Sequence, residues 1–143
     1  MRFAFEDDQL ELAAAVGDLL SREVSPTRVR EAWASDDGRL HDVWAKLADM
    51  GVLGLMVPED AGGMGMGEEE MTLALVQCGR AGLPDPVLSS AMVVAPLLAE
   101  VTAQTSPPDG AVELATTWLE RLPGGATAVA AFPAAKTVAF ANS

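Results

Sequence analysis

Apolar residues recur every three or four positions along much of this chain, which is the spacing of one face of an α-helix. Glycine, proline and acidic residues gather in the stretches between these periodic segments, as is typical of loops. We therefore predict a mainly α protein, an orthogonal bundle of about six helices. The predicted helices span residues 8–23, a short segment that starts at Pro26, 41–50, 68–81, 87–100 and 111–122.

The ends of these predicted helices carry sequence signals of their own. Ser25 and Pro26 are residue types favoured at the N-cap and at the first helical position. From the short helix that follows, Val29 and Trp33 are predicted to face inward. Gly51 stands where a helix favours a glycine of positive φ just past its last residue.

The character of the sequence changes after residue 125. Residues 126–132 and 136–141 are short runs rich in valine, phenylalanine, threonine and alanine, with a proline between them. We predict that they are the first one or two strands of an incomplete β-domain, because two strands alone cannot bury both of their faces. The chain is thereby divided into a helical domain at 1–125 and the start of a β-domain at 126–143.

Residues 44–67 carry the most specific pattern. They run from the end of an amphipathic helix, through a short apolar stretch, into a glycine-dense loop. This segment resembles the N-terminal helical domain of the acyl-CoA dehydrogenase family, which has a "W-x-x-L-x-x-x-G-x-x-G-L-x-V-P-E-x-x-G-G-x-G" segment at this place. The matching residues are Trp44, Leu47, Gly51, Gly54, Leu55, Val57, Pro58, Glu59, Gly62, Gly63 and Gly65. Residues 5–26, 79–91 and 118–125 extend the resemblance, to a bacterial branch of the family, over nearly the whole chain.

The resemblance implies a flavin-dependent activity for a complete protein. Members of the family remove the α-proton of an acyl-CoA thioester with a carboxylate base and pass the β-hydride to FAD. A β-domain and a C-terminal four-helix domain supply most of the flavin site and the catalytic glutamate. The resemblance therefore implies that this chain holds no catalytic residue and is inactive alone, and that its role is to wall the acyl pocket and support the flavin domain.

The helix predicted at 87–100 is apolar on nearly every side, which is typical of a helix surrounded by protein. The resemblance places this helix beside the acyl pocket, with Leu88, Met92, Val93 and Pro96 as its lining residues. Apolar stripes are usually ordinary core, so the same four residues also fit a purely structural role. Because proline breaks the helical hydrogen-bond ladder, Pro96 is expected to leave a bend.

The stretch from Ala130 to Lys136 departs from the family pattern. The family has a "T-E-P-x-x-G-S-D"-like loop here, whose polar groups approach flavin and thioester, and the threonine, acid and glycine are absent from this chain. Ala131 and Phe132 remain as weak candidate contacts with the flavin. The departure suggests a divergent subunit that shares FAD with a better-equipped partner. A non-catalytic, dehydrogenase-like assembly subunit is the alternative.

The resemblance also implies partners, namely an acyl-CoA substrate, acyl-CoA dehydrogenase subunits in a homo- or hetero-oligomer, and an electron-transfer acceptor. The 143 residues include 9 basic and 21 acidic side chains, for a net charge of −12, which opposes binding to nucleic acid or an anionic membrane. The longest apolar run, at 87–98, is shorter than the ~20 residues that a membrane span needs. With no secretory signal visible at the start, a cytoplasmic location is expected.

Other candidate chemistry finds little support in the sequence. His41 is the single histidine, so no metal site is predicted. The loop at 62–67 does not have the spacing of a phosphate-binding loop and is interpreted as a tight turn. Cys78 lies at helical spacing from Met71 and Ala74, which favours a small buried residue over a reactive thiol.

Overall fold

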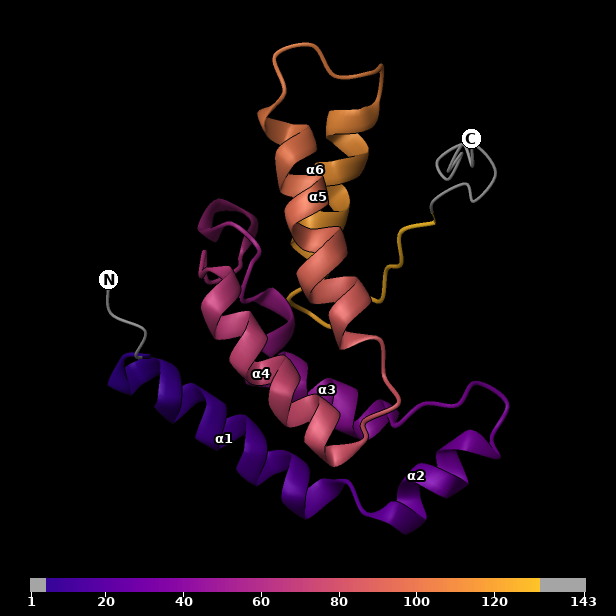
Figure 1. Cartoon of the computed structure of the whole chain (residues 1–143). Helices are drawn as coiled ribbons and strands as arrows, with labels where there is room; N and C mark the ends of the chain where they lie inside the picture. Colours follow the sequence, from indigo (N-terminus) through magenta and orange to yellow (C-terminus); the bar gives the residue numbers. More distant parts are fainter. Residues whose placement is uncertain (1–4, 132–143) are drawn as a thin grey trace, which may run out of the picture.

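A computed structural model describes residues 5–131 of the chain (Figure 1). The described residues are mainly helical, as the sequence predicts. The α-helices are α1 (Asp7–Glu23), α2 (Pro26–Trp33), α3 (His41–Asp49), α4 (Glu68–Ala81), α5 (Ala95–Ala103) and α6 (Ala111–Arg121). Two 3-10 turns, η1 (Val52–Gly54) and η2 (Glu59–Ala61), follow α3, and a π-helical segment, η3 (Leu88–Val94), leads directly into α5.

The first core lies where α1 and α4 run side by side over α3 and η1 (Figure 1). Val16 and Leu20 of α1, Val43 and Leu47 of α3, and Met71 of α4 are fully or almost fully buried in it. These are the apolar stripes that the helical periodicity predicts. Full burial of one such side chain contributes roughly 1.5–3 kcal/mol, so this cluster accounts for much of the stability of the lower layer.

A second, smaller core lies at the base of the α5–α6 hairpin, which rises from the first layer (Figure 1). Its buried residues are Val57, Val94, Ala95, Leu119 and Leu122. The apolar run after α3 connects the two cores, because its earlier residues are buried in the first core and Val57 is buried in the second. The stretch that looks too short for a helix in the sequence is therefore a bridge between two packing centres.

The predicted helix-end signals are confirmed at two places. The Ser25 hydroxyl oxygen accepts a hydrogen bond from the Arg28 backbone N–H (3.2 Å), and Pro26 is the first residue of α2. Gly51 follows α3 with φ of 79°, the left-handed conformation that terminates helices.

The prediction that Trp33 faces inward is wrong. Its side chain is 68% exposed, whereas Val29 and Ala32 are the buried residues of α2. A helix of eight residues presents only a narrow face to the core, and here that face passes through the small Ala32. The bulky neighbour at the last position is consequently turned toward solvent.

The helix predicted at 87–100 is two segments of different winding. Residues 88–94 form the π-helical η3, and α5 begins at Ala95 with Pro96 as its second residue. Proline has no N–H to donate, and its ring crowds the carbonyl four residues earlier in an α-helix. The wider π turn ahead of Pro96 relieves that crowding, which is why the winding changes here.

The predicted first strand is not formed within the described residues. Residues 126–131 have no regular secondary structure, and neither they nor any other described part of the chain forms a strand. The run at 136–141 and Phe132 lie outside the described residues, and the domain boundary at 125 stays a prediction. This segment is held by side chains of the helical layer, as described below.

Candidate functional site

The four predicted acyl-pocket residues lie together on η3 and the start of α5, but in different surroundings. Met92 is half-buried and packs against the first core. Leu88 and Val93 are 54% and 37% exposed, and Pro96 is half-buried. In the described part of the chain they form an apolar stretch of surface, and their role in an acyl pocket stays a prediction.

An apolar groove of about 410 Å³ lies between α5, α6 and residues 127–130. It is lined by Val94, Leu97, Leu98, Leu114, Trp118, Thr127, Ala128, Val129 and Ala130. The Arg121 guanidinium lies 4.6 Å from the centre of the Trp118 ring, a distance typical of a cation–π contact. Apart from the Thr127 hydroxyl, which accepts from Arg39, the lining is apolar, so the groove suits an apolar group.

Residues 127–130 form one wall of the groove, and we call the segment 125–130, which runs on from the turn at Gly125 without regular secondary structure, the strap. The Ser90 hydroxyl donates to the Ala128 carbonyl (2.8 Å) and accepts from the Ala128 N–H (3.2 Å). One side chain thus supplies both hydrogen bonds that a neighbouring strand would give to that residue. The Trp44 indole N–H donates to the Gly125 carbonyl (2.7 Å) and holds the start of the strap.

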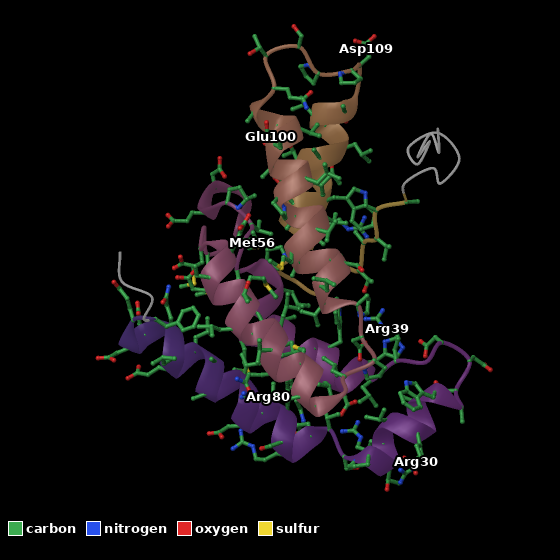
Figure 2. The ribbon with its side chains drawn as sticks, viewed as in Figure 1. Arg30, Arg39, Met56, Arg80, Glu100 and Asp109 are labelled. Carbon is green, nitrogen blue, oxygen red and sulfur yellow. The ribbon has the colours of Figure 1, made fainter. Side chains whose placement is uncertain are left out.

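A third anchor of the strap is a buried ion pair. Arg39 donates through Nε to Asp85 Oδ1 (2.8 Å) and through Nη1 to the Thr127 hydroxyl (3.0 Å). The other carboxylate oxygen of Asp85 accepts from the Leu40 backbone N–H (3.0 Å), and the Asp85 side chain is 0% exposed. Arg39 also lies over the Trp44 ring, 4.7 Å from its centre. Figure 2 shows Arg39 at the foot of the η3–α5 helix, where the helical layer meets the strap.

The described residues do not fit a flavin site by themselves. Ala131 is exposed and has no polar side chain, and Phe132 lies outside the described residues. The polar groups of Ala128 are already bonded to Ser90, and the Thr127 hydroxyl already accepts from Arg39. The candidate flavin contacts at Ala131 and Phe132 stay predictions.

The glycine-dense loop is occupied with its own hydrogen bonds. The backbone N–H groups of Gly63, Met64, Gly65 and Met66 donate to carbonyl groups of residues 54–58. These donors are therefore not free to cradle a phosphate, which supports the interpretation as a tight turn. Gly65 has a φ of 60°, which explains the choice of glycine there.

The remaining candidates are also structural. His41 is exposed and pairs with Asp37, and residues 5–131 contain no cluster of three or more metal-ligating side chains. Cys78 is buried in the first core, and this burial raises the pKa of its thiol to about 11, with a smaller contribution from the Asp85 charge. A thiol of that pKa stays protonated at neutral pH and is a poor nucleophile. Among the described helices, none is long and apolar enough to cross a membrane.

Sequence reasoning missed the groove and its strap anchors. Leu97 and Leu98 of α5 and Trp118 of α6 are recognisable in the sequence as apolar residues. That they face one another depends on how the chain turns between the two helices, which periodicity does not show. Asp85 stands between two prolines, a pattern that is typical of a rigid turn. A carboxylate enclosed by Leu83, Pro84, Pro86 and Val87 was a usable signal, because an acid in apolar surroundings needs a partner.

Comparison with known proteins gives the family directly. Residues 6–105 match the family model described as "Acyl-CoA dehydrogenase, N-terminal domain". The chain is 31% identical over 94 residues to acyl-CoA dehydrogenase IpdE2 of Mycobacterium tuberculosis, which covers 65% of this chain and 30% of that relative. It is also 31% identical over 88 residues to IpdE2 of Mycolicibacterium smegmatis, covering 61% of this chain and 28% of the relative.

Solved structures show the same fold. A chain of the ChsE4-ChsE5 complex from Mycobacterium tuberculosis superposes with a TM-score of 0.74 at 28% identity, covering 87% of this chain and 32% of that one. A chain of a Tcur3481-Tcur3483 steroid ACAD variant superposes with a TM-score of 0.66 at 24% identity, over 83% of this chain and 30% of that one. The chain therefore spans about a third or less of the length of these proteins. On the match of residues 6–105 and this shared helical arrangement, the chain belongs to the acyl-CoA dehydrogenase family, of which it carries the N-terminal domain.

Proposed function

We propose that this chain is the N-terminal helical part of an FAD-dependent acyl-CoA dehydrogenase that forms an α,β double bond in an acyl-CoA thioester. Its own contribution is to wall the acyl pocket with the η3–α5 helix and to support the flavin domain. The catalytic base and the flavin-binding residues come from other parts of the complete protein or from a partner subunit. Lipid or steroid breakdown is the setting that its relatives suggest, since one of them is described as a steroid ACAD variant.

The observation that carries this proposal is the exposed apolar surface of the η3–α5 helix. From residue 87 to residue 99 the segment has no charged side chain, yet Leu88, Val93 and Leu97 are exposed. A helix with apolar residues all round belongs in contact with apolar material on every side. An acyl chain on one part of this surface, and the remainder of the dehydrogenase on the rest, would supply that contact.

The proposed assembly follows from the same reasoning. The Ala128 backbone groups are hydrogen-bonded to Ser90 and the Thr127 hydroxyl accepts from Arg39, so we expect most of the flavin contacts to come from residues elsewhere. The ChsE4-ChsE5 neighbour is described as a complex of two different chains, and this supports a hetero-oligomer with an acyl-CoA dehydrogenase subunit for the present chain as well. An electron-transfer acceptor would then reoxidise the flavin.

The test uses the complete enzyme or complex that contains this chain. Leu88→Trp enlarges an exposed side chain on η3 and should reduce turnover of long or bulky acyl-CoA substrates, steroid thioesters included, while sparing short ones. Leu10→Trp on α1 is the matched control, because Leu10 has similar exposure but lies on another helix. Turnover is measured against a ladder of acyl lengths with an artificial electron acceptor. An unchanged length profile for Leu88→Trp would remove this surface from the pocket.

The second candidate function is a non-catalytic, dehydrogenase-like assembly subunit. The observation that favours it is the loss of the threonine, acid and glycine from the loop at 130–136. Two results together would favour an assembly role over pocket formation. The Leu88→Trp complex would keep full turnover of all acyl lengths, and Leu97→Asp, which places a charge on the exposed surface of α5, would cause the complex to dissociate.

A further inference from the structure

Arg39 meets the strap at the point where the chain leaves the helical layer. Its Nη1 donates to the Thr127 hydroxyl (3.0 Å), and its guanidinium lies 4.7 Å from the centre of the Trp44 ring. The Trp44 indole N–H donates in turn to the Gly125 carbonyl (2.7 Å). Two side chains that contact each other, one just before α3 and one on α3, therefore fix two positions of the strap.

Asp85 fixes Arg39 itself. The carboxylate accepts from Arg39 Nε at 2.8 Å and from the Leu40 backbone N–H at 3.0 Å, and its side chain is 0% exposed. This buried negative charge balances the single positive charge of the guanidinium. With its Nε, its Nη1 and one face of its planar group in contact, Arg39 has little freedom to turn. The direction of its remaining nitrogen is therefore set by these contacts.

That remaining nitrogen, Nη2, is a buried donor without an acceptor. Within residues 5–131 it is the single buried side-chain nitrogen or oxygen that lacks a hydrogen bond. An unsatisfied buried donor costs more free energy than an ordinary hydrogen bond contributes, and the cost is higher for a charged group. Because the other buried polar side chains in this part of the protein have partners, the exception at Arg39 indicates an acceptor outside residues 5–131.

The charge around Arg39 decides the kind of acceptor. Asp85 already neutralises the guanidinium, and the chain carries a net charge of −12, so a second carboxylate would meet repulsion. An uncharged oxygen, such as a backbone carbonyl, satisfies Nη2 without that cost. Arg39 binds Thr127, and the chain passes Thr127 on its way out of the helical layer. The domain that comes next in the complete protein is the part that this path brings to Arg39.

We propose that Arg39 joins the helical domain to the domain that follows it in the complete protein. Its Nη1 holds the strap at Thr127, and its Nη2 donates to an uncharged oxygen of the following domain. This contact deepens the proposed function, on which it rests, because it is a means by which the helical domain supports the flavin domain. Amide exchange detects the contact without flavin or turnover, so its failure is distinguishable from a failure of the proposed function.

The experiment measures backbone amide exchange in the complete protein by mass spectrometry, over peptides that contain residues 125–131. Thr127→Val removes the acceptor of Nη1 at nearly constant side-chain size and leaves Nη2 in place. Arg39→Lys keeps a positive charge beside Asp85 and removes both Nη1 and Nη2. One lost hydrogen bond corresponds to about a fivefold change, so we expect exchange about fivefold faster in Thr127→Val and about 25-fold faster in Arg39→Lys. Arg39→Gln, whose amide can still donate to Asp85, should also exceed Thr127→Val.

Matched controls separate this contact from a general loosening of the protein. Thr117→Val removes a hydroxyl that bonds to a backbone carbonyl within α6, and Arg28→Lys alters another arginine–aspartate pair. Neither control should change exchange at the strap. Peptides that contain Leu40 report on the Asp85 side of the cluster, since the Leu40 amide bonds to that carboxylate, and they should keep their exchange rate in the test variants.

Each result decides on the contact. A larger acceleration at the strap in Arg39→Lys than in Thr127→Val, with the controls unchanged, supports it. Equal acceleration in the two variants would show that Nη2 meets only water in the complete protein and would overturn it. Equal acceleration at Leu40 and at the strap would place the effect at Asp85 and would overturn it too. So would exchange at the strap that none of the variants changes, because Arg39 would then hold nothing there.

Discussion

Replacement of Asp85 by alanine should destabilise this domain far more than its place in a surface turn suggests. The Asp85 carboxylate is 0% exposed and accepts hydrogen bonds from Arg39 and from the Leu40 backbone N–H. Asp85→Ala removes both acceptors at once. It leaves the Arg39 guanidinium, whose side chain is only 20% exposed, without its carboxylate, and the buried Leu40 N–H without an acceptor.

The size of the stability loss in Asp85→Ala depends on the interactions that Arg39 keeps. Loss of one member of a buried ion pair costs about 3–5 kcal/mol, because the other charge is left uncompensated. Arg39 keeps its bond to Thr127, its contact with Trp44 and some solvent, so we expect the lower end of that range, about 3 kcal/mol. Asp85→Asn retains one acceptor and should cost less, about 2 kcal/mol.

A second aspartate provides the matched control. Asp42 accepts two hydrogen bonds from Arg28, at 2.7 and 2.8 Å, and its side chain is 53% exposed. Both are aspartate–arginine pairs, but the Asp42 carboxylate is exposed and has no backbone N–H of another residue among these two bonds, whereas Asp85 is buried and also accepts from the Leu40 N–H. Asp42→Ala should therefore cost at most about 1 kcal/mol, and that cost should shrink at high salt, because solvent screens exposed pairs.

The assay is equilibrium urea unfolding of the three variants at pH 7, at low and at high salt. We expect a large, salt-insensitive loss for Asp85→Ala and a small, salt-sensitive loss for Asp42→Ala. Equal losses in the two alanine variants would refute the reasoning, since burial would then not distinguish the pairs. A change in the slope of the urea dependence would instead point to an altered unfolded state.

Three further outcomes follow from the same structure. Gly63→Ala would place a methyl 2.1 Å from the Val57 carbonyl oxygen and should cost about 3 kcal/mol, whereas Gly62→Ala, which has free space but a φ of 83°, should cost about 1–2 kcal/mol in urea unfolding. The hydrogen bond from Arg28 lowers the pKa of Asp42 in the folded state. The stability that this ion pair contributes is therefore complete above the unfolded pKa of about 3.9 and is lost as the pH falls through the lower folded pKa. Asp42→Asn should thus flatten the fall in urea midpoint between pH 5 and pH 2, and an unchanged profile would contradict this. Cys78, whose pKa burial raises to about 11, should react slowly with iodoacetamide at pH 8 and fully in urea; rapid native labelling would contradict its burial.

The sequence predicted the helices well because their signals are local. Apolar residues three or four positions apart fix which face of α1, α3 and α4 is buried, and capping residues such as Ser25 and Gly51 act on neighbouring backbone groups. The family resemblance rests on the same segment that forms the bridge between the two cores. Both kinds of information are contained in windows of a few turns.

The error at Trp33 occurred where a wider context decides. Trp33 has the spacing of a core residue, but α2 is short and its narrow inner face is already used by Val29 and Ala32. Residues 126–131 have the composition of a strand, but a strand requires a neighbour, so their place at the start of a β-domain stays a prediction. Composition records what a segment favours, whereas its partners decide what it becomes.

Ser90 and Asp85 show why the candidate site was harder to predict than the fold. Each is a polar residue in an apolar run, and the local sequence favours solvent exposure or a turn. Each is nevertheless buried, because its partner arrives from 38 to 46 residues away. A buried polar group without a partner costs more than it contributes, so such residues persist only where the tertiary fold supplies one. Ser90 bonds directly to Ala128 of the strap, and Asp85 pairs with Arg39, which bonds to Thr127 of the strap. The groove that the strap lines therefore depends on a few long-range contacts, and helical periodicity cannot reveal such contacts.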